Sequence, residues 1–153
     1  MTDGTALQSR IEVGMDFSPA ALRAAEMAIA WAERLSAGVQ LVYVWQPPRV
    51  LKADIMLWVD TEEVPLTQHA ERAAAERFAD VLRKLDVGGV TVTTRFAIGH
   101  AADILTEESA APGTVLLALG THGAGFLERA LVGSVASEVV RRARCPVLTM
   151  REA

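Results

Sequence analysis

Cysteine is almost absent from this chain: Cys145 is the only one among 153 residues, so no internal disulfide can form. A chain without disulfides is typical of a reducing compartment, and we expect a cytoplasmic protein. The N-terminal residues MTDGTALQSR lack the apolar stretch of a secretory signal, and no apolar run approaches the roughly 20 residues that a membrane span needs. We therefore predict no association with a membrane. Cys145 itself is expected to be a buried, unreactive thiol.

Positive charge is also scarce. The chain has 15 Lys and Arg against 19 Asp and Glu, a formal net charge of −4, which argues against nucleic acid as a partner. The local basic cluster of Arg141, Arg142 and Arg144 is better explained as favourable charge at the C-terminal end of a helix. The only lysines, Lys52 and Lys84, do not follow a glycine, so the Gly-Lys-Ser/Thr signature of a P-loop is absent.

Short apolar runs alternate with amphipathic stretches along the whole chain. Its 51% hydrophobic and 22% charged content suits one folded domain, which we take as residues 1–153. The alternation predicts a Rossmann-like α/β fold: a single doubly wound, five-stranded parallel sheet of strand order 3-2-1-4-5, with helices on both faces. The expected strands are residues 11–15, 39–45, 90–96, 115–119 and 146–150, and the expected helices are residues 19–37, 67–85, 101–110 and 134–142.

The ends of the first helix and one long connection call for separate predictions. Ser18 before Pro19 is typical of an N-cap followed by the first helical residue, and Gly38 is expected to end that helix. Residues 46–66 give the weakest pattern, with three prolines and scattered apolar residues. We expect a long loop there, with a mobile or partly helical lid.

Glycines gather after the fourth expected strand, in the stretch GTHGAGFLERALVGS at residues 120–134. Gly120 and Gly123 would let the main chain approach a ligand closely, and Gly133-Ser134 stands where the last helix begins. A helix N-terminus offers unpaired N–H groups and partial positive charge, so it suits a phosphate. The dinucleotide pattern G-x-G-x-x-G is absent, since residues 120–125 run G-x-x-G-x-G. On the glycines alone, a phosphate cradle and a tight strand-to-helix turn are equally supported.

The spacing Gly120-x-x-Gly123, nine residues, then Gly133-Ser134 resembles the G-2x-G-9x-G-S/T motif of the universal stress protein family, in its ATP-binding, single-domain branch. The similarity extends over almost the whole chain, through VGMDFS, LVYVW, FAIGHAADI and RRARCPVLTMR. It implies an ATP site, with Mg²⁺ held mainly by phosphate oxygens. It also implies a homodimer paired through the strand at Pro146 to Met150.

The resemblance assigns expected roles to nine residues. Asp16 would accept hydrogen bonds from ribose hydroxyls, Met15 and Val44 would border the adenine, and Leu119 and Gly120 would line the adenosine side. Gly123, Gly133, Ser134 and Val135 would hold the phosphates. Three places depart from the family. Ala124 stands where a basic residue is frequent, and Gly113-Thr114 replaces an acidic residue that is common before the fourth strand, with little expected consequence. Phe17 stands where many members have glycine and is expected to narrow the mouth of the site.

Three functions stay open at this point. The first is an ATP-binding stress sensor or regulator that hydrolyses ATP slowly at most, because no catalytic base and no P-loop lysine is identifiable. The second is a dimeric interaction scaffold of the same fold that binds no nucleotide. The third is a hydrolase or transferase of a related α/β fold, which would need catalytic groups that the sequence does not offer. The histidines show no metal-ligand spacing; His69 and His100 are expected to be solvated or helix-terminal, and His122 to have a surface or structural role.

Overall fold

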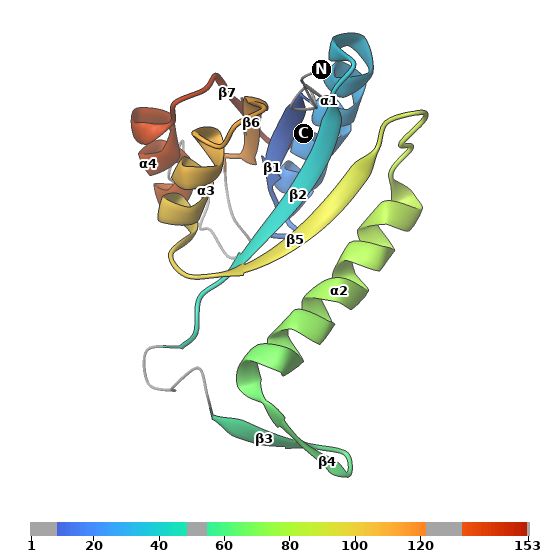
Figure 1. Cartoon of the computed structure of the whole chain (residues 1–153), viewed down its shortest axis with the longest axis vertical. Helices are drawn as coiled ribbons and strands as arrows, with labels where there is room; N and C mark the ends of the chain where they lie inside the picture. The colour runs from blue at the N-terminus through green and yellow to red at the C-terminus, as the bar shows by residue number, and fades with distance from the viewer. Residues whose placement is uncertain (1–8, 49–54, 122–132, 153) are drawn as a thin grey trace, which may run out of the picture.

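The computed structural model describes residues 9–48, 55–121 and 133–152. Five strands form one sheet in the order β5-β2-β1-β6-β7, and each neighbouring pair is parallel (Figure 1). Taken in chain order, this is the predicted 3-2-1-4-5 topology, so the fold prediction is confirmed. The strands are β1 (Arg10–Gly14), β2 (Gly38–Trp45), β5 (Val92–Ile98), β6 (Thr114–Gly120) and β7 (Val147–Met150).

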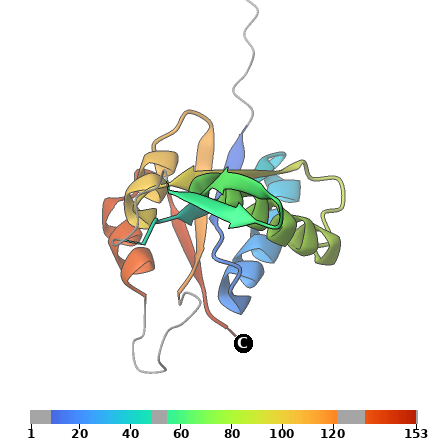
Figure 2. The same ribbon diagram turned by 90° about the horizontal axis from the view of Figure 1, so that it is seen from below.

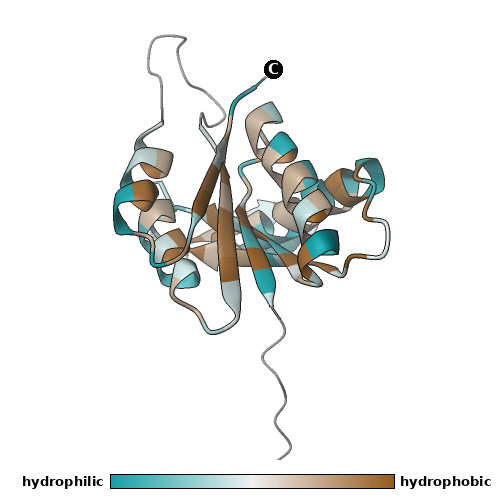
Figure 3. Ribbon diagram, turned by 90° about the horizontal axis from the view of Figure 1, so that it is seen from above, coloured by the Kyte–Doolittle hydropathy of each residue, from teal (hydrophilic) through white to brown (hydrophobic). Residues whose placement is uncertain are grey.

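Helices cover both faces of the sheet. One face carries α1 (Pro19–Leu35) and α2 (Leu66–Lys84), and the other carries α3 (Ala101–Ser109) and α4 (Ser134–Arg142). Figure 3 shows the apolar strands between these two layers. Two cores result: a larger one between the sheet and α1 with α2, and a smaller one beneath α3 and α4. Six of the seven buried residues of α1 are alanines, so this helix packs close to the sheet.

The first helix begins as predicted but ends differently. The Ser18 hydroxyl oxygen accepts a hydrogen bond from the Ala21 amide at 3.2 Å, and Pro19 is the first helical residue. The helix ends at Leu35, where Ser36 adopts a left-handed conformation with φ of 51°. The prediction that Gly38 ends the helix is therefore wrong. Gly38 opens β2 instead and pairs with Arg10.

A β-hairpin replaces part of the loop that we expected at residues 46–66. Strand β3 (Met56–Val59) pairs antiparallel with β4 (Glu62–Pro65), and α2 follows directly (Figure 2). Val64 is buried, whereas Trp58 on the opposite face of the hairpin is 75% exposed. The expected helical lid is thus absent from residues 55–65, and residues 49–54 lie outside the described part of the chain. None of the helices in the described residues is long and apolar enough to cross a membrane.

Candidate functional site

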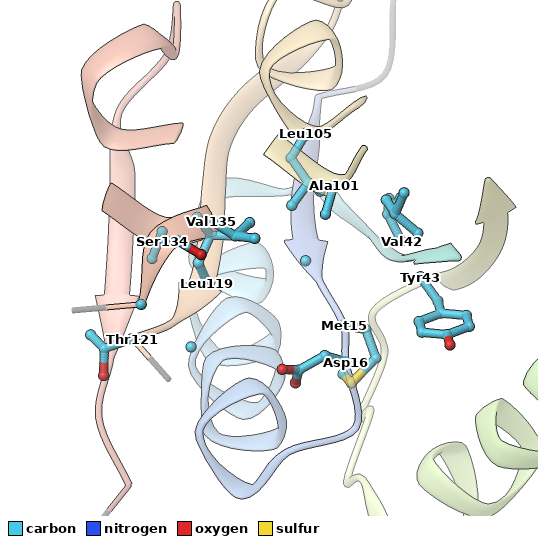
Figure 4. Close-up of a pocket in the computed structure, with 15 residues that line it drawn as sticks. Met15, Asp16, Val42, Tyr43, Ala101, Leu105, Leu119, Thr121, Ser134 and Val135 are labelled. Carbon is cyan, nitrogen blue, oxygen red and sulfur yellow. The ribbon is translucent and has the colours of Figure 1, made fainter. Parts of the chain in front are cut away.

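A cavity of about 190 Å³ opens at the carboxyl ends of β1, β2 and β6 (Figure 4). Strand order reverses between β1 and β6, which is where ligands bind in doubly wound sheets. The N-terminal residues of α3 and α4 complete the wall. The lining residues are Gly14, Met15, Asp16, Val42, Tyr43, Val44, Ala101, Leu105, Leu119, Gly120, Thr121, Gly133, Ser134, Val135 and Ala136.

The cavity gathers eight of the nine residues singled out by sequence: Met15, Asp16, Val44, Leu119, Gly120, Gly133, Ser134 and Val135. The ninth, Gly123, lies outside the described residues, as do His122 and Ala124. Sequence reasoning missed Val42, which lies two residues before Val44 on the same face of β2. It also missed Ala101 and Leu105, whose place in the wall depends on how α3 packs against the sheet.

Glycine at position 120 is required by packing. A Cβ built there would lie 2.9 Å from the Ala21 nitrogen and 3.0 Å from the carbonyl carbon and Cβ of Ala20. These are mostly backbone atoms of the first turn of α1, which cannot move aside easily. Gly120 therefore lets the end of β6 pass close to α1, in addition to lining the cavity.

The first turn of α4 forms the opposite wall. Gly133 is its N-cap and has no side chain that could accept a hydrogen bond from the turn, and Ser134, Val135 and Ala136 line the cavity. The Gly133 amide donates to the carbonyl oxygen of Thr121, which joins the end of β6 to the start of α4. A helix start of this kind, without a side-chain cap, suits an anionic group.

Asp16 contributes the carboxylate of the site. Its Oδ1 accepts a hydrogen bond from the Ser18 amide at 2.9 Å, which fixes the turn between β1 and α1. Figure 4 shows the carboxylate extending toward the side of the cavity formed by Thr121 and Ser134. Met15, by contrast, is buried, and together with Val42, Val44 and Leu119 it makes much of the wall apolar. An apolar wall with one carboxylate suits a flat heterocycle attached to a hydroxylated group.

Phe17 lies elsewhere than expected. It is not among the residues that line the cavity, and its ring packs instead into the core beneath α1 and α2. The expectation that it narrows the mouth is therefore wrong. The backbone turns the side chain to the other face of the sheet, which the sequence alone does not reveal.

An ion-pair network braces the two helices beside the cavity. The Arg142 guanidinium donates to Asp103 Oδ1 at 2.8 Å and to Glu138 Oε1 at 2.6 Å, so α4 is tied to α3. The hydrogen bond from Arg142 lowers the pKa of the Asp103 carboxyl below its ordinary value. Arg141 and Arg142 occupy the last turn of α4, which confirms the interpretation as helix-terminal charge for these two residues, whereas Arg144 lies beyond the end of the helix.

The other candidate reactive groups among the described residues, His69, His100 and Cys145, do not line the cavity. His69 is exposed, and His100 is the N-cap of α3, with its Nδ1 3.4 Å from Asp103 Oδ2. Across residues 9–48, 55–121 and 133–152, no group of three or more His, Cys, Asp or Glu side chains could hold a metal ion. Cys145 is half-buried rather than fully buried, and burial raises the pKa of its thiol, which disfavours the reactive thiolate.

Comparison with known sequences agrees with this architecture. The model of the universal stress protein family matches residues 9–151. A universal stress protein of Methanocaldococcus jannaschii is 28% identical over 150 residues, which is 98% of this chain and 86% of the relative. One from Mycolicibacterium smegmatis is 32% identical over 153 residues, which is 97% of this chain and 48% of the relative. The chain thus spans about half the length of the mycobacterial protein.

Solved structures share the fold. The chain is similar to the hypothetical protein MJ0577, with a TM-score of 0.77, 22% identity and coverage of 97% of this chain and 99% of that one. It is similar to a universal stress protein in complex with cAMP, with a TM-score of 0.65, 22% identity and coverage of 95% and 98%. A universal stress protein of Archaeoglobus fulgidus in complex with dAMP has a TM-score of 0.63 and 16% identity, with coverage of 94% and 98%. The family match over residues 9–151 and the shared sheet topology lead to one conclusion: this chain belongs to the universal stress protein family.

Proposed function

We propose that this chain binds an adenine nucleotide, with ATP as the main ligand, and acts as a nucleotide-dependent sensor or regulator of stress. The observation that carries the proposal is the convergence of eight motif residues, from β1, β2, β6 and α4, on one cavity at the switch point of the sheet. Two structural neighbours support the ligand class, because they are described as complexes with cAMP and dAMP.

The cavity suits the nucleoside part of such a ligand. Its volume of about 190 Å³ is below the roughly 300–1,000 Å³ that is usual for drug-sized ligands. In the proposal, the base lies against Met15, Val42 and Val44, and the ribose hydroxyls donate to Asp16. The phosphates extend past Gly133 toward the amides of Ser134 and Val135, with Gly123 of the motif beside them. Mg²⁺ would be held through phosphate oxygens, since the described residues offer no ligand cluster for it.

Fast turnover does not fit the composition of the wall. Among the lining residues in the described part of the chain, Asp16 is the only carboxylate, and none is a lysine, an arginine or a histidine. Phosphoryl transfer depends on positioned cations and a group that orients the nucleophile. Backbone amides can bind phosphates in the ground state without supplying these groups. We therefore propose slow hydrolysis at most, and a regulatory rather than an enzymatic role.

The proposal includes a cytoplasmic homodimer paired through β7, which is an edge strand of the sheet. The Leu117 amide donates to the Pro146 carbonyl and the Thr121 amide to the Met150 carbonyl, so these two carbonyls face β6. Along a strand, the backbone N–H and C=O groups of successive residues point to alternate sides. The backbone groups of Thr149 therefore point away from β6, toward the open edge of the sheet. They are available to pair with the same strand of a second copy.

Thermal shift and calorimetry with Mg-ATP, ADP and AMP test the nucleotide assignment. At 100 times Kd, a ligand adds about 2.7 kcal/mol to the free energy of unfolding. For a domain of this size the melting temperature should rise by roughly 5–11 °C. Gly123→Val should abolish the rise while the protein stays folded. Absence of a rise in the parent protein at millimolar nucleotide would favour the nucleotide-free scaffold.

A further inference from the structure

Phe17 has a backbone conformation that an aromatic residue rarely adopts. Its φ is 65°, in the left-handed region, where the Cβ of an L-residue crowds the following carbonyl oxygen. Two further residues in the described part of the chain have positive φ without being glycine. Ser36 ends a helix, and Asp60 lies in the hairpin turn. Phe17 lies in neither setting. Strain of this kind persists only where surrounding contacts hold it.

Three contacts hold the Phe17 ring. Its centroid lies 5.1 Å from that of Tyr43 on β2 and 5.2 Å from that of Phe78 on α2. The Arg77 guanidinium carbon lies 4.0 Å above the ring centroid, on the same helix as Phe78. Tilted and edge-to-face rings at these distances attract one another, as does a guanidinium over a ring face. The side chain is thus clamped on the α1–α2 face of the sheet, away from the cavity.

The residues on both sides of Phe17 are tied to the site and to α1. Asp16 lines the cavity (Figure 4). Its Oδ1 accepts a hydrogen bond from the Ser18 amide at 2.9 Å. The Ser18 hydroxyl oxygen in turn accepts from the Ala21 amide at 3.2 Å and caps α1. If Phe17 relaxed to negative φ, the chain direction between Asp16 and Ser18 would change and the hydrogen bond across the turn would break. The orientation of the Asp16 carboxylate depends on the left-handed residue between them.

We propose that Phe17 is a positioning residue of the nucleotide site: its clamped ring holds the turn in the left-handed conformation that aims Asp16 into the cavity. This inference rests on the proposed nucleotide binding. Phe17 acts through Asp16 and does not touch the ligand. The ring offsets the strain of the turn, so the binding-competent conformation exists before the ligand arrives.

Substitutions at position 17 test this role, because positioning and packing predict different orders of nucleotide affinity among the variants. Alanine removes the clamp and keeps the preference of an L-residue for the right-handed region, so the competent population should fall and the affinity for adenosine and ATP should drop about 5- to 30-fold. Glycine also removes the clamp but adopts either hand about equally, so the loss should be about twofold. Phe17→Tyr should retain the parent affinity. Calorimetry at a temperature where every variant is folded measures these values.

Two controls separate positioning from general destabilisation. Leu85→Ala truncates a buried side chain at the C-terminal end of α2 that is not among the residues lining the cavity, so it should lower the melting temperature and leave the affinity unchanged. In a double-mutant cycle, adding Phe17→Ala to Asp16→Ala should cause no further loss of adenosine affinity.

Equal affinities of the alanine and glycine variants, or full additivity in the cycle, would overturn the role of Phe17 while nucleotide binding stands. A parent protein that binds neither adenosine nor ATP would overturn both proposals.

Discussion

Gly120→Ala provides a direct test of why the chain has glycine at position 120. The added Cβ would lie 2.9 Å from the Ala21 nitrogen and 3.0 Å from two atoms of Ala20. Because the obstructing atoms belong mostly to the backbone of the first helical turn, either β6 or α1 must shift. Overpacking of this kind costs about 1–3 kcal/mol. For a domain of this size, the melting temperature should fall by about 2–12 °C.

Gly38→Ala is the matched control, because it adds the same methyl group to another strand of the same sheet. Its Cβ would meet one atom, the Thr91 carbonyl oxygen, at 3.4 Å, which is an ordinary contact. Replacing a strand glycine also removes its entropic cost of roughly 0.5–1 kcal/mol, so Gly38→Ala should be neutral or stabilising. Differential scanning calorimetry without ligand compares the two variants. Equal melting temperatures would refute the packing argument and leave ligand approach as the reason for Gly120.

Three further predictions follow from the same structure. Burial raises the pKa of the Glu12 carboxyl above its ordinary value of 4.5, so protonation stabilises the folded state, and this contribution is lost as pH rises from that value through the raised pKa. Glu12→Gln should reduce the pH dependence of the free energy of unfolding, measured with urea, in this pH range. An unchanged pH dependence would contradict the role of burial. Asp16→Ala should weaken ATP and adenosine by similar factors in calorimetry; a loss confined to ATP would disprove a ribose contact. Thr149→Pro removes an outward-facing amide without breaking a bond to β6, so it should yield monomers in sedimentation at concentrations where the parent is dimeric, and a surviving dimer would exclude pairing through β7.

The sequence predicted elements whose signals are local. The last helix, Ser134–Arg142, was predicted with the observed boundaries, because an N-terminal Gly-Ser and a basic last turn mark both ends. Features that depend on tertiary contacts were not predicted. Ser36 ends α1 in a left-handed conformation, two residues before Gly38 pairs with Arg10, and serine is an unusual residue for that conformation. The hairpin turn at Asp60-Thr61 has no glycine, so its strands could not be recognised from turn chemistry.

The candidate site was more predictable than the loops around it, since its strongest feature is backbone exposed by glycine and a helix start. Side chains that the fold brings in from α3, such as Ala101 and Leu105, carry no motif of their own. The sequence also could not show that Gly120 serves α1, because the close atoms lie about a hundred positions away in the chain. Gly120 therefore has two roles in the structure: it allows close packing against α1, and it lines the cavity.

The two roles of Gly120 affect how strongly the glycine motif supports nucleotide binding. If packing alone required Gly120, a family member could keep this glycine without any ligand, so its presence is weak evidence for nucleotide. Gly133 gives stronger evidence, because a residue with a side-chain oxygen at that N-cap would satisfy the first turn of α4 and stabilise the helix. The chain instead has a residue without a side chain there, beside an apolar cavity that carries a single carboxylate. The backbone amides of the first turn of α4 thus have no side-chain cap. This lowers helix stability by only a few tenths of a kcal/mol, a loss that a bound phosphate would more than offset.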